Sequence, residues 1–285
     1  MLKKLIKYEW KGVYKMGLIL LGVVAFATLL GFLASRSPLW SDVMIYSDFA
    51  EGLATTVSFF SIMLYIILLA GTIYAVMIYV AVRFYRTMYT DEGYLLHTLP
   101  VGKHQILISK ILVSAIWLLI TYIAMFVSIL CFVVFMMEAI SPGSFGEMMA
   151  DLPSVLGEIG RELRNLTGSE RLRLIHFLVS LILSVLIGIP TGIVTIFGAI
   201  SLGQLFSKHR VLMAILCYVG IVIGAGLFSS IMRTVVMSGS FWYSVDQVFG
   251  YFFTLLDSTL VLNILSLVGF YLLSYYITSK KLNME

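Results

Sequence analysis

Charge and cysteine are both scarce in this sequence. Only 12% of its 285 residues are Asp, Glu, Lys or Arg, whereas a soluble domain carries about 25%. This scarcity, together with 60% hydrophobic residues, excludes an ordinary soluble domain and a disordered chain. The two cysteines, Cys131 and Cys217, both lie within uncharged stretches, so a disulfide scaffold and an exposed redox motif are excluded as well.

In place of charge, the sequence has long stretches without Asp, Glu, Lys, Arg or His. A membrane-spanning helix needs about 20 mostly apolar residues. Six stretches approach or exceed this length, which predicts an all-α membrane protein, a single six-helix domain over residues 1–285. The predicted spans are at about 16–34, 53–82, 111–137, 177–206, 211–232 and 259–279.

The basic residues indicate how the six spans are oriented. Thirteen Lys and Arg fall on the side that holds both ends of the chain, and six fall on the other side. Acidic residues are distributed the opposite way, 4 against 11. Because cytoplasmic loops carry the excess of Lys and Arg, we expect both termini in the cytoplasm. The net charge of +4 then reflects this asymmetry and indicates no nucleic-acid partner.

The sequence lacks the motifs of several kinds of chemistry. It has no GxxxxGK[ST] loop, so we expect the chain not to be an enzyme that hydrolyses nucleotide by that route. It has no His, Cys and Glu group with metal-ligand spacing. The ionisable side chains of the spans are cysteines and tyrosines, whereas proton- and ion-coupled carriers keep acidic or basic residues inside the bilayer.

Residues 1–15 predict an amphipathic helix ahead of the first span. Two leucines, Ile6, Trp10 and Val13 fall on one face of a helical wheel, and five lysines fall on the other. Glu9 interrupts the apolar face. A helix of this kind lies in the membrane interface. The lysines could act as an orientation signal alone, or the helix could be an elbow that contacts a partner with the participation of Glu9.

The loop between the second and third spans contains a short predicted helix. Thr90 is suited to cap it, Asp91 and Glu92 suit its positive N-terminal end, and Pro100 ends it. A helix of about nine residues is unstable alone in water. It nevertheless presents an apolar cluster, which either folds back on the bundle or lipid or binds a partner surface. The cluster consists of Tyr94, Leu95, Leu96 and Leu99.

Two further segments outside the spans have distinctive patterns. The loop over residues 138–176, on the side opposite to the termini, is predicted to contain a helix at Ser154–Asn165 with one apolar face. Val248–Leu256 is an apolar run of nine residues ended by Asp257. Because nine residues are too few to cross the bilayer as a helix, we expect this run to be re-entrant or interfacial.

The second span carries hydroxyl groups along one side. Such a stripe lines a pathway in some proteins and joins helices by hydrogen bonds in others, and the sequence leaves both open. The residues within about 60° of one another on a helical wheel are Ser58, Ser61, Tyr65, Thr72 and Tyr79.

Three features together resemble the permease subunit of ABC-2-type transporters, and most of all the small permeases of bacterial exporters. The first is the N-terminal stretch LKKLIKYEW before the first span. The second is the loop sequence TDEGYLLHTLP, followed by Lys103, Ser109 and Lys110. The third is the six-span plan with an apolar segment before the last span. The resemblance covers the whole chain, although the loop at residues 138–176 is longer than the family leads us to expect.

The resemblance implies a set of partners in a bacterial plasma membrane. Two permease subunits, identical or different, pair in the bilayer, and two separate ATPase subunits that bind ATP and Mg²⁺ dock on the cytoplasmic side. The permease binds no cofactor. Its loop helix acts as the coupling helix, and its N-terminal helix is an elbow that approaches the ATPase. The residues carried over to ATPase coupling are Asp91, Glu92, Gly93, Tyr94, Leu95, Leu96, Leu99, Pro100 and Glu9, and the five hydroxyl residues of the second span become candidates for the pathway lining.

The first hypothesis is therefore the permease of an ATP-driven exporter of a peptide, lipid or drug-like substrate. The alternative is a non-transporting sensor, immunity or assembly protein whose loop helix binds another cytoplasmic partner, because hydroxyl-only stripes suit it equally well. An ion-coupled carrier is a third and weaker hypothesis. The substrate, the choice between a homodimer and a heterodimer, and export against import stay open.

Overall fold

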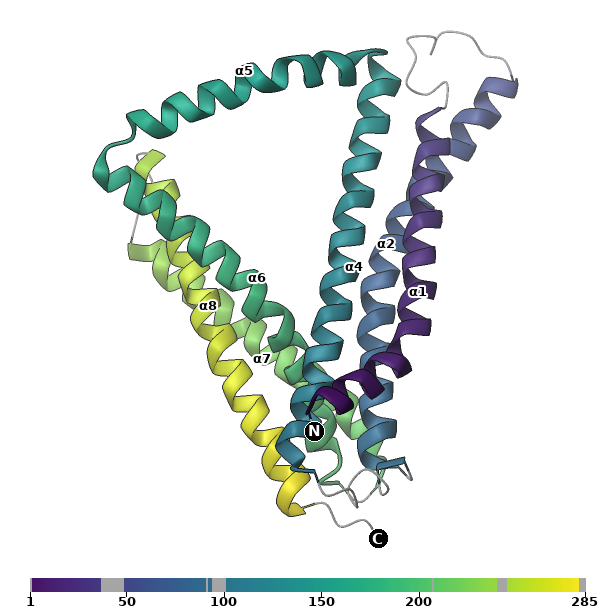
Figure 1. Ribbon diagram of the computed structural model, residues 1–285, viewed down its shortest axis with the longest axis vertical. Coiled ribbons are helices and arrows are strands. Elements are labelled where there is room, and N and C mark those ends of the chain that lie inside the picture. Colours follow the sequence, from purple (N-terminus) through teal and green to yellow (C-terminus); the bar gives the residue numbers. More distant parts are fainter. Residues whose placement is uncertain are drawn as a thin grey trace. The chain divides into compact units, whose positions relative to one another are not determined.

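The structure, a computed structural model, is helical throughout the residues that it describes, which are 2–36, 49–90, 92–93, 101–206, 208–239 and 245–281. Figure 1 shows the order of the elements along the chain. The helices are α1 (Leu2–Ser35), α2 (Phe49–Tyr89), α4 (Lys103–Ile140), α5 (Ser144–Asn165), α6 (Gly168–Gly203), α7 (Arg210–Gly239), α8 (Val245–Tyr276) and the π-helix η2 (Ile277–Lys281).

Within the described residues, six helices are long and apolar enough to cross a membrane. They are α1, α4 and α6, together with Thr56–Tyr89 of α2, Arg210–Met232 of α7 and Leu255–Ser279 at the end of the chain. The prediction of an all-α chain with six helices suited to span a membrane is thus confirmed for the described residues. Several of these helices extend beyond the uncharged stretches, because a helix continues past the bilayer wherever its residues favour it.

Three segments outside the spans can be compared with the sequence-based expectations. The helix predicted at Ser154–Asn165 is present and begins earlier, at Ser144. The N-terminal amphipathic segment is continuous with the first spanning helix in α1, and its place in the membrane interface stays a prediction. The sequence predicts that Val248–Leu256 is re-entrant or interfacial. The expectation of a separate re-entrant element is wrong, because α8 begins at Val245 and continues through Asp257, and an interfacial position of its first turns stays a prediction.

The continuation of α8 through Asp257 has a local explanation. The Ser180 hydroxyl of α6 donates a hydrogen bond of 3.0 Å to Asp257 Oδ1. His176 Nε2, also on α6, lies 3.6 Å from Asp257 Oδ2. A carboxylate with such partners can remain in a helix, so the charge that ends the apolar run does not end the helix.

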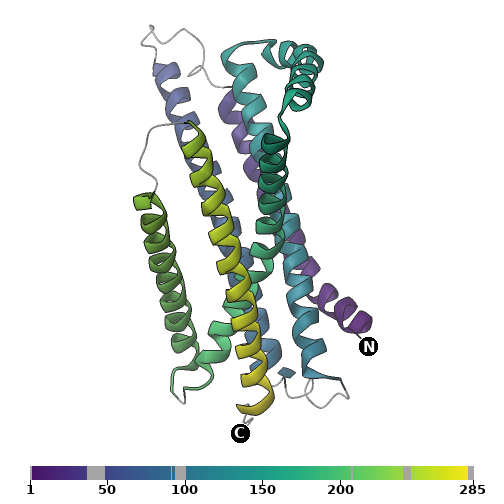
Figure 2. The same cartoon turned by 90° about the vertical axis from the view of Figure 1, so that its left-hand side faces the viewer.

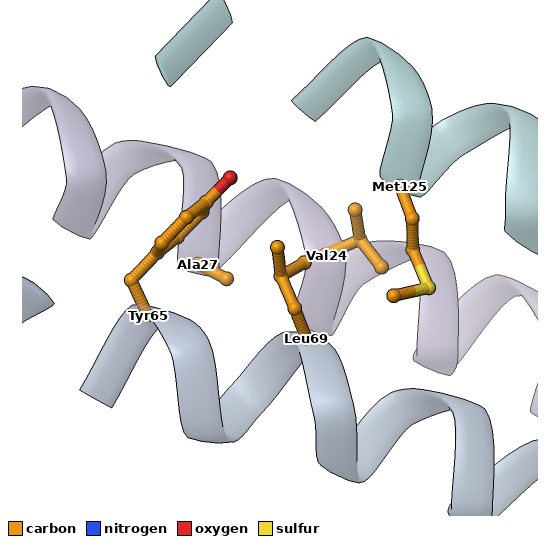
Figure 3. Packing of buried hydrophobic residues seen from close by; sticks show 5 residues of the cluster. All are labelled: Val24, Ala27, Tyr65, Leu69 and Met125. Carbon is orange, nitrogen blue, oxygen red and sulfur yellow. The ribbon is translucent and has the colours of Figure 1, made fainter. Parts of the chain in front are cut away.

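The chain divides into two compact units. The first comprises Met1–Trp10, Tyr79–Ile116 and Ser169–Glu285, and the second comprises Lys11–Ile78 and Trp117–Gly168. The core of the second unit is formed by apolar side chains of α1, α2 and α4. Figure 3 shows the five buried members of this core, which are Val24, Ala27, Tyr65, Leu69 and Met125.

The core of the first unit gathers the end of α2 and the second half of α6. The rings of Phe84 and Phe197 stack with centroids 3.7 Å apart, and both are almost completely buried. In Figure 2, α7 lies alongside α8, and the two helices are in contact. Ala214 is the one buried residue among the described side chains of α7, so most of the apolar surface of this helix is open to lipid or to another chain.

Candidate functional site

The segment predicted to couple to an ATPase begins where α2 ends. Six of its residues lie outside the described residues, namely Asp91, Tyr94, Leu95, Leu96, Leu99 and Pro100. Glu92 is exposed, and the Gly93 N–H donates a hydrogen bond of 2.7 Å to the carbonyl of Thr90. A Cβ on Gly93 would come within 2.6 Å of the Met88 carbonyl oxygen, so the close approach of the chain to α2 requires glycine.

The side chain of Thr90 contacts the last turn of α2. Its hydroxyl donates a hydrogen bond to the carbonyl of Arg86. In this position the side chain satisfies a carbonyl in the last turn of α2, where the helix itself supplies no donor. The structure therefore places Thr90 as a residue that closes α2, and the described contacts do not show it as an N-cap of the following segment.

Next to this segment, three helices meet around a buried carboxylate, that of Glu9 in α1. Lys110 Nζ of α4 lies 2.6 Å from Glu9 Oε1, and Arg83 Nη2 of α2 lies 2.9 Å from Glu9 Oε2. The Arg83 Nε donates a second bond to the same oxygen at 3.3 Å. Lys110 Nζ also donates to the Thr87 hydroxyl at 2.6 Å. We call Glu9, Arg83, Thr87 and Lys110 the Glu9 cluster.

Helix geometry explains why α2 supplies two members of the Glu9 cluster. Arg83 and Thr87 are four positions apart, which places them on the same face of α2. The Thr87 hydroxyl donates to the Arg83 carbonyl at 2.8 Å, so its oxygen lone pairs are oriented toward Lys110. Each Glu9 oxygen thus has a charged donor, and Lys110 has two acceptors.

Burial makes the Glu9 cluster energetically important. The side chains of Lys110 and Glu9 are only 4% and 7% exposed, and that of Arg83 is 21% exposed. An isolated buried charge is strongly unfavourable, and removal of one partner from a buried ion pair typically costs about 3–5 kcal/mol. With one carboxylate and two cations, the cluster carries a formal charge of +1, and the most exposed cation is Arg83.

A second polar group joins the same end of α2 and the start of α4 to α6 and to η2, which follows α8 directly. The hydroxyl of Tyr89 lies 2.7 Å from the Ser201 hydroxyl and 3.5 Å from that of Thr278. Lys103 Nζ donates to the carbonyls of Thr278 at 3.1 Å and Ser279 at 3.3 Å. These are carbonyls near the end of a helix, where cations are favoured. We call Tyr89, Lys103, Ser201, Thr278 and Ser279 the Tyr89 cluster.

The two clusters hold both flanks of the predicted coupling segment. α2 ends at Tyr89 and α4 begins at Lys103, and each of these residues belongs to the Tyr89 cluster. Further into the two helices, Thr87, two residues before the end of α2, and Lys110, seven residues after the start of α4, are joined in the Glu9 cluster. The two flanks of the loop are thus joined by ionic and hydrogen-bonded contacts to α1, α6 and η2.

No protein-family model, curated protein or solved structure matches the chain. The described residues contain no group of three His, Cys, Asp or Glu that would hold a metal ion.

The residues predicted to line a pathway have mixed environments. In the second unit, Ser58, Tyr65 and Thr72 are buried, while Ser61 is partly exposed. The Tyr65 hydroxyl lies 3.3 Å from that of Ser128. Tyr79 belongs to the first unit and is partly exposed. Their role in a pathway stays a prediction.

The partners of Tyr65 form a third polar group, which the sequence interpretation missed. The Ser128 hydroxyl of α4 lies 2.7 Å from the Thr28 hydroxyl of α1, and Thr28 donates to the Val24 carbonyl at 2.8 Å. We call Thr28, Tyr65 and Ser128 the hydroxyl cluster. It joins α1, α2 and α4 inside their uncharged stretches, as hydroxyl groups often do between membrane helices.

The sequence also contains a signal for the Glu9 cluster, which is an acidic residue on an apolar helix face. Glu9 stands out on the apolar face of the N-terminal segment, and a buried acid requires a cation. Arg83 and Lys110 border the second and third uncharged stretches, where basic residues are also expected as orientation signals. The pattern could have suggested a pairing, but only the fold selects these two cations among the basic residues on that side.

Proposed function

We propose that this chain is the membrane-spanning permease subunit of an ATP-binding-cassette exporter of the ABC-2 type. In this proposal the chain forms the substrate pathway with a second permease subunit, and separate ATPase subunits supply the energy. The substrate is a peptide, lipid or drug-like molecule. Support comes from the six apolar helices and from the loop sequence between α2 and α4.

The observation that carries the proposal is the fixing of both flanks of that loop. A coupling element has to pass a displacement of its partner to the spanning helices, which requires rigid connections at its base. The Glu9 cluster and the Tyr89 cluster supply such connections on α2 and α4. In the proposed mechanism, ATP binding closes the ATPase subunits, the loops move with them, and the spanning helices tilt between inward- and outward-facing states.

The proposal is tested by purification of the tagged chain from its native membrane in mild detergent, with identification of every accompanying protein by mass spectrometry. We expect a soluble ATPase with a Walker motif. It should be lost in the Leu95→Asp variant and kept in the matched Leu95→Met variant, since an aspartate is disfavoured in an apolar cleft. A preparation that keeps other membrane complexes intact but contains no ATPase would contradict the proposal.

One observation favours a second candidate, a non-transporting sensor, immunity or assembly protein. Three of the hydroxyl residues expected to line a pathway, Ser58, Tyr65 and Thr72, are buried, and Tyr65 is hydrogen-bonded to Ser128 of α4. This is the arrangement of a packing contact between helices. The same purification separates the two candidates, because the second predicts a cytoplasmic partner without a nucleotide-binding motif.

A further inference from the structure

The helix α5 has a continuous apolar stripe that none of the described contacts covers. None of its side chains, all of which the structure describes, is buried. On a helical wheel the apolar residues fall within about 120° of one another. The stripe consists of Phe145, Met148, Met149, Leu152, Val155, Leu156, Ile159 and Leu163.

The corner between α4 and α5 sets the direction of α5. Both Glu138 carboxylate oxygens accept backbone hydrogen bonds, from Gly143 N–H at 2.8 Å and from Phe145 N–H at 3.3 Å. Gly143 has φ of 90°, a conformation that favours glycine. In Figure 1, α5 leaves the end of α4 sideways and does not fold back along it. Because Glu138 accepts hydrogen bonds from backbone N–H groups at the start of α5, specific contacts hold the two helices in this orientation at the corner.

The connection to α4 places α5 at the level of the membrane surface. The uncharged stretch of α4 ends at Met137, and α5 begins seven residues later. Ile140, the last residue of α4, is 60% exposed, so the apolar surface of the spanning helix extends up to the corner. A helix held sideways at this position lies parallel to the bilayer surface if α4 crosses it.

The polar face of α5 is predominantly acidic. It carries four carboxylates against two arginines, a formal charge of −2. The acidic members are Glu147, Asp151, Glu158 and Glu162, and the basic members are Arg161 and Arg164. Interfacial helices that depend on anionic lipid instead have a polar face rich in Lys and Arg. Attachment of α5 to a membrane must therefore come from its apolar stripe.

We propose that α5 lies in the interface of the bilayer, with its stripe against the acyl chains and its acidic face toward water. Its partner is zwitterionic lipid in the leaflet where α4 ends. The helix thereby holds the end of α4, from which it continues in sequence, at the level of the interface. This inference depends on the spanning character of α4 and holds for either candidate function.

The test uses the full chain in bilayer discs of zwitterionic lipid. In a Cys131→Ala, Cys217→Ala background, single cysteines carrying a nitroxide label are placed along α5. Leu156→Cys represents the stripe and Glu158→Cys is the matched position on the polar face. Collisions of the label with oxygen, which concentrates in lipid, and with a water-soluble nickel chelate are measured by electron paramagnetic resonance.

We expect Leu156→Cys to favour oxygen over nickel and Glu158→Cys to show the reverse. The ratio should oscillate along α5 with a period of about 3.6 residues. Replacement of part of the zwitterionic lipid by anionic lipid should not increase the depth of the stripe in the bilayer. Equal access of nickel to both positions would overturn the proposal, since α5 would then stand in water. An immobilised label at position 156 that is protected from both reagents would overturn it in favour of a protein contact, including a second copy of this chain.

Discussion

The Glu9 cluster and the hydroxyl cluster join the same three helices by different means. At the Glu9 cluster, α1, α2 and α4 are joined by a carboxylate between two cations. At the hydroxyl cluster they are joined by uncharged hydrogen bonds beside an apolar core. Glu9 and Thr28 are 19 positions apart, and the corresponding separations on α2 and α4 are 18 positions. Along each helix the two clusters are therefore separated by about five turns.

This difference follows the distribution of charge along the three helices. The Glu9 cluster lies outside the uncharged stretches, and its Arg83 side chain is 21% exposed. The hydroxyl cluster lies within the stretches, where a charged side chain is much more expensive than a hydroxyl group. We infer that strong contacts are concentrated at the end next to the predicted coupling segment.

The largest expected effect is that of Glu9→Gln. This change leaves Lys110, which is 4% exposed, without its carboxylate partner. We expect a loss of about 3–5 kcal/mol in the free energy of unfolding. The measurement is unfolding of the purified chain by SDS in mixed micelles, followed by circular dichroism. Glu147→Gln on the exposed α5 is the matched control, and a loss at Glu9 no larger than in this control would show that the ion pairs do not stabilise the fold.

The second prediction separates the pairing from the burial of each charge. We expect Glu9→Leu combined with Lys110→Met to destabilise the chain by about 1–3 kcal/mol less than the sum of the single changes. Each single change leaves one buried charge without its partner, whereas the double change removes both charges. Arg83 remains, but its 21% exposure allows its charge to reach water. The double-mutant cycle uses the same unfolding assay. Additive losses would mean that the two side chains act independently.

The two clusters also show which parts of the fold can be predicted from the sequence. Uncharged stretches predicted the spanning helices because transfer of about 20 apolar residues into a bilayer is a property of the segment itself. The amphipathic pattern predicted the helix at Ser154–Asn165 for a similar reason. The pairs Glu9–Lys110 and Thr28–Ser128 join residues about 100 positions apart, and no local pattern encodes such a contact. The same limit applies to Asp257, whose partners on α6 the apolar run does not reveal.

The smallest expected effect is that of Tyr65→Phe in the hydroxyl cluster. The change removes one hydrogen bond of 3.3 Å to Ser128 and keeps the buried ring, which stacks on Phe132. Interhelical hydrogen bonds in membranes are worth about 0.6 kcal/mol on average and about 1.7 kcal/mol at most. We expect a loss in this range by the unfolding assay. A loss as large as that of Glu9→Gln would remove the contrast between the two clusters.

The central claim is that the loop between α2 and α4 contacts an ATPase, and a photo-crosslink tests it most directly. In the Cys131→Ala, Cys217→Ala background, a short photoreactive group is attached to Leu95→Cys or, as control, to Glu147→Cys on α5. The variants are illuminated in native membranes, and adducts are identified by mass spectrometry. The account predicts adducts with a Walker-type ATPase from position 95 and none from position 147. Adducts from position 95 only with lipid, with this chain or with a protein that lacks a nucleotide-binding motif would contradict it.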